Sequence, residues 1–474
     1  MDIDGNRFYI DGQWQRPEGR SQIAVVDPYL ESAVGHVTCG SATDAERAVS
    51  AARRAFRGFS DSSVEDRLAL LDRIRMLLAE RAESLAQTLV SEMGAPIGFA
   101  RTSQVPFAIE HVRIQTEVLR QYPFLTVEAG MAIAREAIGV CGLITPWNWP
   151  LYQITAKVAP AIAAGCTVVL KPSELTPYSA LLFAQVMHDA EVPPGVFNLV
   201  MGTGEVVGAA LSQHDEVDLI SITGSTRAGV AVAQAAATSV KRVVQELGGK
   251  SPNLFLEDAD FTVGVPKGVQ SAMRNAGQSC SAPTRMLVPQ ARLAEVEELA
   301  AAEAARFVVG YPRDAKTTMG PIANAAQFRR VQALIEVGIA EGGRLIYGGP
   351  GRPEGLERGY FTRPTIFSDV TPRMRIAREE IFGPVLVIMP YVDEGHAIEL
   401  ANATEYGLGA HLQSQDPKRA RRVARQIRSG QVHINYPAWS GVAPFGGYKR
   451  SGNGREYGVY GLEEYLETKA ILGY

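Results

Sequence analysis

Short apolar segments alternate with helical ones between Cys141 and Gly249, and this alternation constrains the fold more than any other feature of the sequence. Such alternation is typical of βαβ units, in which a helix connects parallel strands. A second alternating region runs from Pro252 to about Gly430. We therefore predict an α/β fold built on parallel sheets. In the first region the expected strands are 168–170, 198–201, 219–222 and one beginning at Val243, and the expected helices are 179–190 and 227–238.

The segment before this region adds a hairpin, helices and a strand arm. Residues 8–14 alternate around an Asp-Gly turn and predict a β-hairpin. Residues from Asp44 to about Glu92 carry Ala, Leu, Arg and Glu at helical spacing. This spacing predicts two amphipathic helices, the first capped by residues 41–44. Residues 121–134 turn toward β-branched and aromatic side chains and predict strands.

Length and charge narrow the class of protein. The chain has 474 residues, enough for two or three domains, and a formal net charge of −4, which argues against a dedicated nucleic-acid-binding protein. The N-terminus lacks the basic and apolar regions of a signal peptide. The longest apolar run, 158–170, is too short to span a bilayer and contains Pro160 and Gly165. We expect a cytoplasmic protein with no nucleic-acid or membrane partner.

The cysteines are few and widely spaced. They form no CxxC pair and no Cys/His cluster, so we expect neither a disulfide framework nor a metal site. A reducing cytosol would keep each of them available as a thiol. The four are Cys39, Cys141, Cys166 and Cys280.

Two residues in glycine-bearing runs suggest covalent chemistry. Cys280 ends the run 275–280, and Glu246 begins the run 246–250. A thiol can attack a carbonyl, and a carboxylate can take a proton from water to hydrolyse the product of that attack. Taken alone, a single Cys and a single Glu are more often an inert thiol and a surface carboxylate. The motifs around them favour the chemical interpretation.

Two further segments predict a dinucleotide site. Residues 224–229 follow an expected strand and open an expected helix, where backbone N–H groups can bind a pyrophosphate. Residues 171–174 follow another strand, at the edge where doubly wound sheets bind ligands. Glu174 can accept hydrogen bonds from both ribose hydroxyls and repels a 2′-phosphate, which favours NAD over NADP. The alternatives are a plain capped helix at 224–229 and a helix N-terminal acid at Glu174.

Seven motifs in a fixed order closely resemble those of the NAD(P)-dependent aldehyde dehydrogenase superfamily, over essentially the whole chain. Any one of them is weak by itself, but the ordered set is specific. Glu246 is present, whereas members that pass the acyl group to coenzyme A generally lack this glutamate, so the resemblance is to the hydrolytic, non-acylating branch. The motifs are 145–150, 171–174, 224–226, 246–250, 277–280 extending to Arg285, 379–384 and 444–447.

The resemblance implies a Rossmann-like cofactor domain, an α/β catalytic domain and a small β oligomerisation arm. It also implies a homodimer or homotetramer. The expected boundaries are 1–121 and 138–249 for the NAD-binding domain, 250–450 for the catalytic domain, and 122–137 with 451–474 for the arm and C-terminal segment.

The same resemblance assigns catalytic roles. Cys280 would attack the aldehyde, and Asn148 together with the Cys280 backbone N–H would stabilise the oxyanion. Glu246 would activate the hydrolytic water. Lys157 and Glu456 match positions implicated in proton relay.

Cofactor contacts also follow from the resemblance. Lys171 and Glu174 would contact the adenosine ribose, Ser225 the pyrophosphate and Glu380 the nicotinamide ribose. The full predicted set is Trp147, Lys171, Ser173, Glu174, Gly204, Ser225, Leu247, Glu380 and Phe382.

The substrate positions are mostly aromatic, which favours a medium-to-large hydrophobic or aromatic aldehyde. Arg274 suggests an alternative, an ω-oxo acid whose carboxylate it would bind. The second arginine of such enzymes is replaced here by Ala156, and an internal salt bridge for Arg274 is a further possibility. The predicted pocket is Trp149, Gln153, Arg274, Ser279, Ser281, Trp439 and Phe445.

Two other functions compete with an NAD-dependent dehydrogenase. One is a catalytically silent NAD-binding scaffold, against which the intact Cys280, Glu246 and Asn148 argue. The other is a cofactor-free thiol hydrolase, against which Lys171, Glu174 and the other cofactor positions argue.

Overall fold

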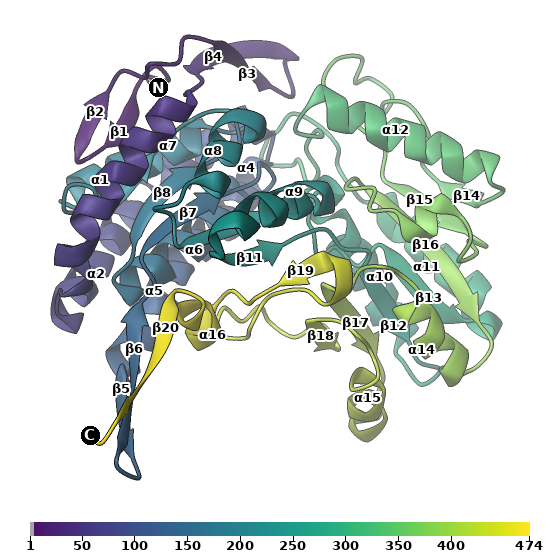
Figure 1. Cartoon of the computed structure of the whole chain (residues 1–474). Coiled ribbons are helices and arrows are strands. Elements are labelled where there is room, and N and C mark those ends of the chain that lie inside the picture. Colours follow the sequence, from purple (N-terminus) through teal and green to yellow (C-terminus); the bar gives the residue numbers. More distant parts are fainter. Residues whose placement is uncertain (1–3) are drawn as a thin grey trace.

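The structure is a computed structural model that describes residues 4–474, and it contains two large β-sheets with helices around them (Figure 1). The first sheet has eight strands in the order β19-β11-β10-β7-β8-β9-β1-β2. Its five central strands are parallel, as the alternation predicts, and β1 and β19 pair antiparallel at either side. The strands are β1 (Phe8–Ile10), β2 (Gln13–Gln15), β7 (Val140–Ile144), β8 (Thr167–Lys171), β9 (Phe197–Leu199), β10 (Leu219–Thr223), β11 (Arg242–Glu246) and β19 (Gly452–Asn453).

The helices expected at 179–190 and 227–238 are present, whereas those at Val105–Gln121 and Pro150–Ala164 were not predicted. The predicted cap is present, because Ser41 and Asp44 form a reciprocal capping box. The expected pair of helices over residues 44–92 is wrong, since the chain breaks twice and Ser63 caps an additional helix. The helices are α1 (Ala42–Ser60), α2 (Val64–Glu80), α3 (Ala82–Met93), α4 (Ile97–Phe99), α5 (Val105–Gln121), α6 (Pro150–Ala164), α7 (Tyr178–Asp189), α8 (Ala209–Gln213) and α9 (Thr226–Ala236).

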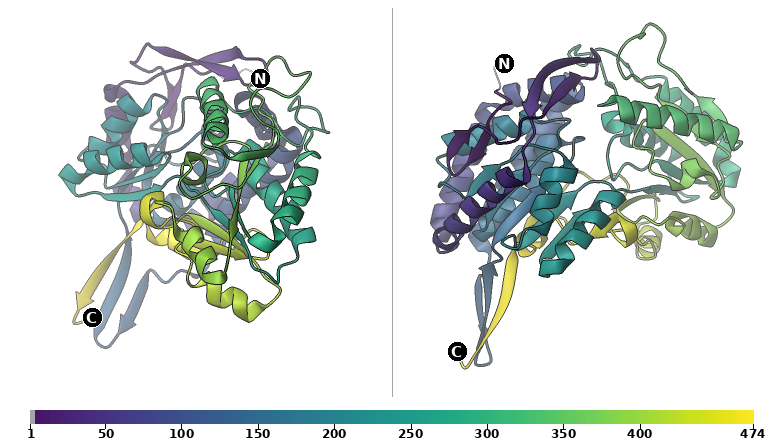
Figure 2. Two further views of the ribbon diagram at one scale, coloured as in Figure 1. Left: turned by 90° about the vertical axis from the view of Figure 1, so that its right-hand side faces the viewer. Right: turned by 45° about the horizontal axis from the view of Figure 1, so that its top comes forward.

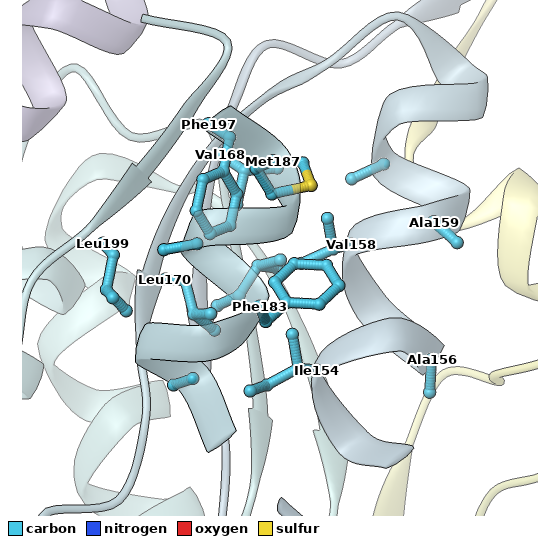
Figure 3. Close-up of a cluster of buried hydrophobic side chains, with 14 of the residues drawn as sticks. Ile154, Ala156, Val158, Ala159, Val168, Leu170, Phe183, Met187, Phe197 and Leu199 are labelled. Atoms are coloured by element: carbon cyan, nitrogen blue, oxygen red, sulfur yellow. The ribbon is translucent and has the colours of Figure 1, made fainter. Parts of the chain in front are cut away.

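Helix α6 lies at the centre of the first core, and all of its residues are buried. Figure 3 shows Ile154 and Val158 of this helix close to Phe183, with Val168 and Leu170 of β8 beside them. Burying an aliphatic or aromatic side chain of this size contributes about 1.5–3 kcal/mol. A polar side chain on α6 must therefore find its partner inside the protein.

The second sheet has seven strands in the order β14-β15-β16-β13-β12-β17-β18, and only β14 is antiparallel to its neighbour. It has a hydrophobic core of its own. The strands are β12 (Pro252–Phe255), β13 (Arg285–Pro289), β14 (Arg344–Tyr347), β15 (Thr365–Ser368), β16 (Val385–Tyr391), β17 (Gly409–Gln413) and β18 (Gln431–Ile434). The helices of this half are α10 (Phe261–Met273), α11 (Leu293–Ala304), α12 (Ala325–Ala340), α13 (Arg375–Arg378), α14 (Glu394–Asn402) and α15 (Pro417–Ala424). The last helix, α16 (Gly458–Glu463), packs against α5 and α6 of the first half.

A three-stranded sheet extends away from the rest of the chain (Figures 1 and 2). It consists of β5 (Leu125–Glu128), β6 (Met131–Ala137) and β20 (Leu466–Leu472), with β6 in the middle. The strands expected near 121–134 are therefore present, joined by a strand from the far end of the sequence. Both faces of β5 are exposed. A separate hairpin, β3 (Gln22–Asp27) and β4 (Ser32–Thr38), covers one end of the first sheet.

None of the helices within residues 4–474 combines the length and the apolar character needed to cross a membrane.

Candidate active site

The carboxyl ends of four parallel strands bring the predicted residues to one edge of the first sheet. Strand β7 ends at Ile144, β8 at Lys171, β10 at Thr223 and β11 at Glu246. The segments that follow these ends are 145–150, 171–174, 224–226 and 246–250, which are four of the seven motifs. An open α/β sheet binds its ligands at this edge.

The loop that carries Cys280 has an unusual backbone. Asn275, Ala276 and Gly277 have φ angles of 55°, 53° and 71°, so two residues with side chains occupy the left-handed region. Each such residue costs of order 1 kcal/mol and must be held by its surroundings. Asn275 is held on both sides, because Gln104 donates to its Oδ1 at 3.2 Å and its Nδ2 donates to Asn148 O at 2.9 Å.

Glycines of two other motifs pack against this loop. A Cβ on Gly277 would lie 2.0 Å from Gly383 O, and a Cβ on Gly249 would lie 2.4 Å from Cys280 O. No side chain fits at either position. The motifs 246–250, 277–280 and 379–384 therefore meet around the thiol.

Asn148 is buried next to the thiol loop. Its Nδ2 donates to Gln278 O at 3.0 Å, two residues before Cys280. Cys280 itself is partly exposed. Burial of the sulfur, and then the charges of Glu380, Glu246 and Glu456, raise the pKa of the Cys280 thiol above its usual value. The thiol therefore rests protonated and needs a base.

Glu246 is the last residue of β11 and is only 1% exposed. Neither of its carboxylate oxygens has a hydrogen-bond partner among the described residues. Burial, and then the nearby charge of Glu456, raise its pKa well above the usual value, while Lys157 acts in the opposite direction. A buried carboxyl with both oxygens free is suited to taking up and releasing a proton.

Lys157 and Glu456 form a buried ion pair. The Lys157 Nζ lies 2.5 Å from Glu456 Oε1 and donates to Ser221 Oγ at 3.0 Å. Lys157 projects from the fully buried helix α6, so this pair satisfies its charge. Both members influence the pKa of Glu246, so the three side chains form one electrostatic group.

The residues predicted for the adenosine side of a dinucleotide lie at two strand ends. Lys171 Nζ is 3.1 Å from Glu174 Oε2. Glu174 lies before the first residue of α7, Tyr178, so the alternative of a helix N-terminal acid is wrong. Ser225 is exposed and caps α9, its Oγ accepting from Ala228 N at 3.2 Å. The exposed helix start fits a pyrophosphate, and the charged pair at the other strand end fits a ribose diol.

Glu380 comes from the other half of the chain. It lies half-buried against residues 248–249, and its Oε1 accepts from Gly249 N at 3.0 Å. Burial raises the pKa of Glu380 to about 7. A carboxyl held at this point, with further acceptor capacity, fits a second ribose diol.

The remaining cofactor predictions have local structural roles in the fold. The rings of Trp147 and Phe382 meet edge to face at 5.3 Å. Leu247 packs against Gly229 of α9, and Ser173 Oγ accepts from the backbone N–H of Leu175. Gly204 opens a short π-helical turn.

The predicted substrate residues form an aromatic group next to the thiol loop. Trp149 Nε1 donates to Ser279 Oγ at 2.9 Å. Trp439 stacks on Phe107 at 4.7 Å. Phe445 stacks on Tyr457 at 5.2 Å. Two of the predicted residues are polar: Gln153 accepts from Thr223 Oγ1 at 3.3 Å, and Ser281 follows Cys280 in the same turn.

Arg274 is surrounded by aromatic rings and forms no ion pair with a carboxylate of the described residues. Its guanidinium carbon lies 5.2, 5.6 and 5.8 Å from the ring centres of Phe99, Phe107 and Trp149. Its Nη2 donates to Ser103 Oγ at 2.9 Å. No carboxylate within residues 4–474 forms an ion pair with it, so the expected internal salt bridge is absent. It also lines a surface cavity of about 330 Å³.

Several residues of this region were missed in the sequence. Tyr152 could have been found, because it lies between the predicted pocket residues Trp149 and Gln153 at the start of α6. Tyr457 follows Glu456 directly. Phe99, Phe107 and His111 lie in segments without a motif, so only the fold brings them to the site.

The chain is similar to known proteins over nearly its whole length. The model of the aldehyde dehydrogenase family matches residues 14–471. A 3-succinoylsemialdehyde-pyridine dehydrogenase of Pseudomonas sp is 53% identical and is covered, like this chain, over 99% of its length. A crystal structure of a mutant aldehyde dehydrogenase C from Pseudomonas syringae, complexed with NAD+ and octanal, is 63% identical with a TM-score of 0.99, covering 100% of this chain and 98% of that chain. An aldehyde dehydrogenase from Bartonella henselae is 44% identical with a TM-score of 0.97, covering 99% of both.

Proposed function

Because the chain belongs to the aldehyde dehydrogenase family and is an NAD-dependent aldehyde dehydrogenase, we propose that Cys280 carries the acyl intermediate and Glu246 releases it by hydrolysis. The product is then a free carboxylic acid. The observation that carries this proposal is the fully buried Glu246 carboxyl, whose two oxygens have no partner among the described residues. The same observation favours the hydrolytic branch over transfer to coenzyme A.

The first step is attack of the Cys280 sulfur on the aldehyde carbon. The thiol proton passes to Glu246, whose raised pKa makes it a competent acceptor. As the C–S bond forms, the carbonyl electrons move to oxygen. That oxygen receives hydrogen bonds from the second amide hydrogen of Asn148 and from the Cys280 backbone N–H.

Oxidation of this adduct leaves a thioester on Cys280. NAD, when bound, supplies the acceptor for the hydride that leaves the former aldehyde carbon. Lys171, Glu174 and Ser225 would hold its adenosine and pyrophosphate end, and Glu380 would hold its nicotinamide ribose.

Hydrolysis completes the cycle. The proton that Glu246 took from the thiol must first leave through the buried pair of Lys157 and Glu456. Glu246 then takes a proton from a water molecule while that water attacks the thioester carbon. The C–S bond breaks and the electron pair returns to the Cys280 sulfur. The buried pair of Lys157 and Glu456 stabilises the changing charge of Glu246 and relays its proton.

The aromatic group supports a medium-to-large hydrophobic or aromatic aldehyde as substrate. Trp149, Trp439 and Phe445 supply apolar surface next to the thiol loop. Octanal in one related structure and the pyridine-bearing substrate in the name of another relative are consistent with this class.

The experiment measures formation of NADH from NAD and of NADPH from NADP, using aliphatic, aromatic, terpenoid and ω-carboxy aldehydes. We expect turnover with NAD, weaker turnover with NADP, and none in Cys280→Ala. Binding of NAD without turnover of any aldehyde would instead indicate the silent scaffold. Turnover of an ester or thioester without NAD would indicate the cofactor-free hydrolase.

A second candidate is oxidation of an ω-oxo acid, and the unpaired guanidinium of Arg274 favours it. A carboxylate at the far end of the aldehyde would supply the partner that Arg274 lacks. We expect Arg274→Met to lower kcat/KM for an ω-carboxy aldehyde about tenfold or more relative to the methyl-ended aldehyde of the same length, and Arg274→Lys to restore part of the difference. An equal effect on both aldehydes would exclude this candidate.

The wider assembly is also proposed. The exposed arm of β5, β6 and β20 supports a homodimer or homotetramer. Within one chain, residues 1–121 and 138–249 would form the NAD-binding domain and residues 250–450 the catalytic domain. A cytoplasmic location suits a thiol nucleophile, because reducing conditions protect it.

A further inference from the structure

A hydrogen-bond acceptor without a donor lies inside the aromatic group. His111 of α5 is 3% exposed, and its Nδ1 lies 3.2 Å from Thr155 Oγ1. The single hydroxyl hydrogen of Thr155 goes to Tyr152 O at 3.1 Å. Thr155 Oγ1 therefore accepts from His111, so the ring hydrogen is on Nδ1 and Nε2 is a bare acceptor.

No group among residues 4–474 donates to that nitrogen. Burial lowers the pKa of His111 to about 3, so the ring stays neutral at physiological pH. Leaving a buried acceptor unpaired costs about 1–3 kcal/mol. The position is therefore set up for a donor that the protein itself does not supply.

Two tyrosine hydroxyls beside His111 supply a hydrogen-bond donor. The hydroxyls of Tyr152 and Tyr457 bond to each other. The two rings lie 4.3 and 4.8 Å from the His111 ring. Two hydroxyls share one mutual bond, so one of their hydrogens remains to be donated elsewhere. The cluster thus presents one free acceptor and one free donor.

The backbone of Tyr457 shows that this hydroxyl is held in place at a cost. Its φ and ψ are 71° and 151°, a region that is essentially restricted to glycine. Such strain persists only where the surroundings fix the residue, and here the ring stacks on Phe445 and the hydroxyl bonds to Tyr152. Strain of this kind clusters at ligand sites.

The cluster adjoins both the thiol and the outside of the protein. The charge of Cys280 acts on Tyr152 and on Tyr457. Trp439 lies 5.8 Å from the His111 ring and is 36% exposed. A substrate that passes Trp439 to reach Cys280 would therefore run beside His111.

We propose that His111, Tyr152 and Tyr457 form a polar subsite that selects aldehydes bearing a hydroxyl or N–H group away from the carbonyl. The substrate donor would bond to His111 Nε2, and a hydroxyl oxygen would accept the spare tyrosine hydrogen. This proposal rests on the proposed function and specifies its substrate class. The three side chains are specificity determinants and take no part in the chemistry at Cys280.

The test compares aldehydes that differ by one donor group. Suitable pairs are 4-hydroxyphenylacetaldehyde with phenylacetaldehyde, and 8-hydroxyoctanal with octanal. We expect the native enzyme to have a kcat/KM about tenfold higher for the hydroxylated member of at least one pair. The analogue without the hydroxyl would leave the buried His111 nitrogen and the tyrosine hydroxyl without hydrogen-bond partners. His111→Phe and Tyr457→Phe should bring this ratio close to one.

Tyr436→Phe is the matched control. Its hydroxyl also makes two partly buried hydrogen bonds, accepting from Asn253 Nδ2 and donating to Gly264 O. It lies in the second half of the chain, so the ratio should stay at the native value. If His111→Phe does not fold, Tyr457→Phe, which removes one oxygen, carries the test. Equal kcat/KM within both pairs in the native enzyme, or an unchanged ratio in the variants, would overturn the subsite. Absence of NADH from every aldehyde would instead overturn the proposed function.

Discussion

At the scale of single residues, the proposed mechanism makes activity depend on two protons. The thiol of Cys280 and the carboxyl of Glu246 both have a raised pKa, so at low pH each is in its inactive, protonated form. Activity should therefore increase as the pH rises through neutrality and beyond. A profile of kcat/KM against pH measures this, and a decrease over the same range would contradict the assignment.

Glu246→Gln removes the proton acceptor of both steps of the cycle. The amide cannot take the proton of water, so we expect kcat to fall about 10²–10⁴-fold. It cannot take the proton of the Cys280 thiol either, so the burst of NADH in the first turnover should also be slower than in the native enzyme. Rapid-mixing absorbance measures both quantities. Glu336→Gln, on an exposed face of α12, is the matched control, and native turnover in Glu246→Gln would rule out this base.

Most of the residues that we assign to the site could be predicted because they lie in motifs, four of which lie at strand ends along one edge of the first sheet. The hydrogen bonds and neighbours of these side chains could not be predicted. The absence of a carboxylate beside Arg274 depends on which side chains face it, and the pairing of His111 with Thr155 joins two helices through the fold.

At the scale of elements, the thiol loop depends on glycine. Gly277 has a φ of 71°, and a Cβ there would lie 2.0 Å from Gly383 O. Gly277→Ala should therefore shift the loop, and a displacement of about 1 Å lowers kcat roughly 10²-fold. Gly58→Ala is the control, since Gly58 lies exposed in α1 with no atom near the added methyl. Steady-state kinetics and thermal unfolding of both variants check this, and native kcat in Gly277→Ala would refute it.

Elements with a strong hydrophobic period were predictable and short polar ones were not. Strands β8 and β10 and helix α9 follow the alternation of the sequence. Strand β19 contains only Gly452 and Asn453, so no period exists to detect, and it forms only because β11 offers a free edge. The region 44–92 was expected to contain one break and contains two, because Ser63 and Arg81 interrupt an otherwise continuous helical pattern.

At the scale of the whole molecule, the arm exposes apolar side chains that contact with a second chain would bury. Val127 is 57% exposed and Leu472 is 81% exposed. We expect the protein to be a dimer or tetramer and the double variant Val127→Asp, Leu472→Asp to have a lower mass by light scattering. Val240→Asp, at an isolated exposed turn, should leave the mass unchanged. A monomeric native protein would contradict this expectation.

The division into two sheets was predictable from the two alternating regions, because each contains enough strands for a parallel sheet. The joining of distant segments was not. Strand β20 pairs with β6 to complete the arm, and Glu456 forms an ion pair with Lys157. The partners of both pairs are about 300 or more residues apart in the sequence, so no local pattern predicts them.

The Lys157–Glu456 pair imposes an order of events during synthesis. Glu456 is added 299 residues after Lys157, which at about 5–20 residues per second leaves roughly 15–60 s between them. During this interval the Lys157 ammonium lacks its counter-ion, so packing α6 into its final buried position would strand a charge. The first core is therefore expected to remain loosely packed on the ribosome. Chaperones would have their longest access to this protein before its last strand emerges.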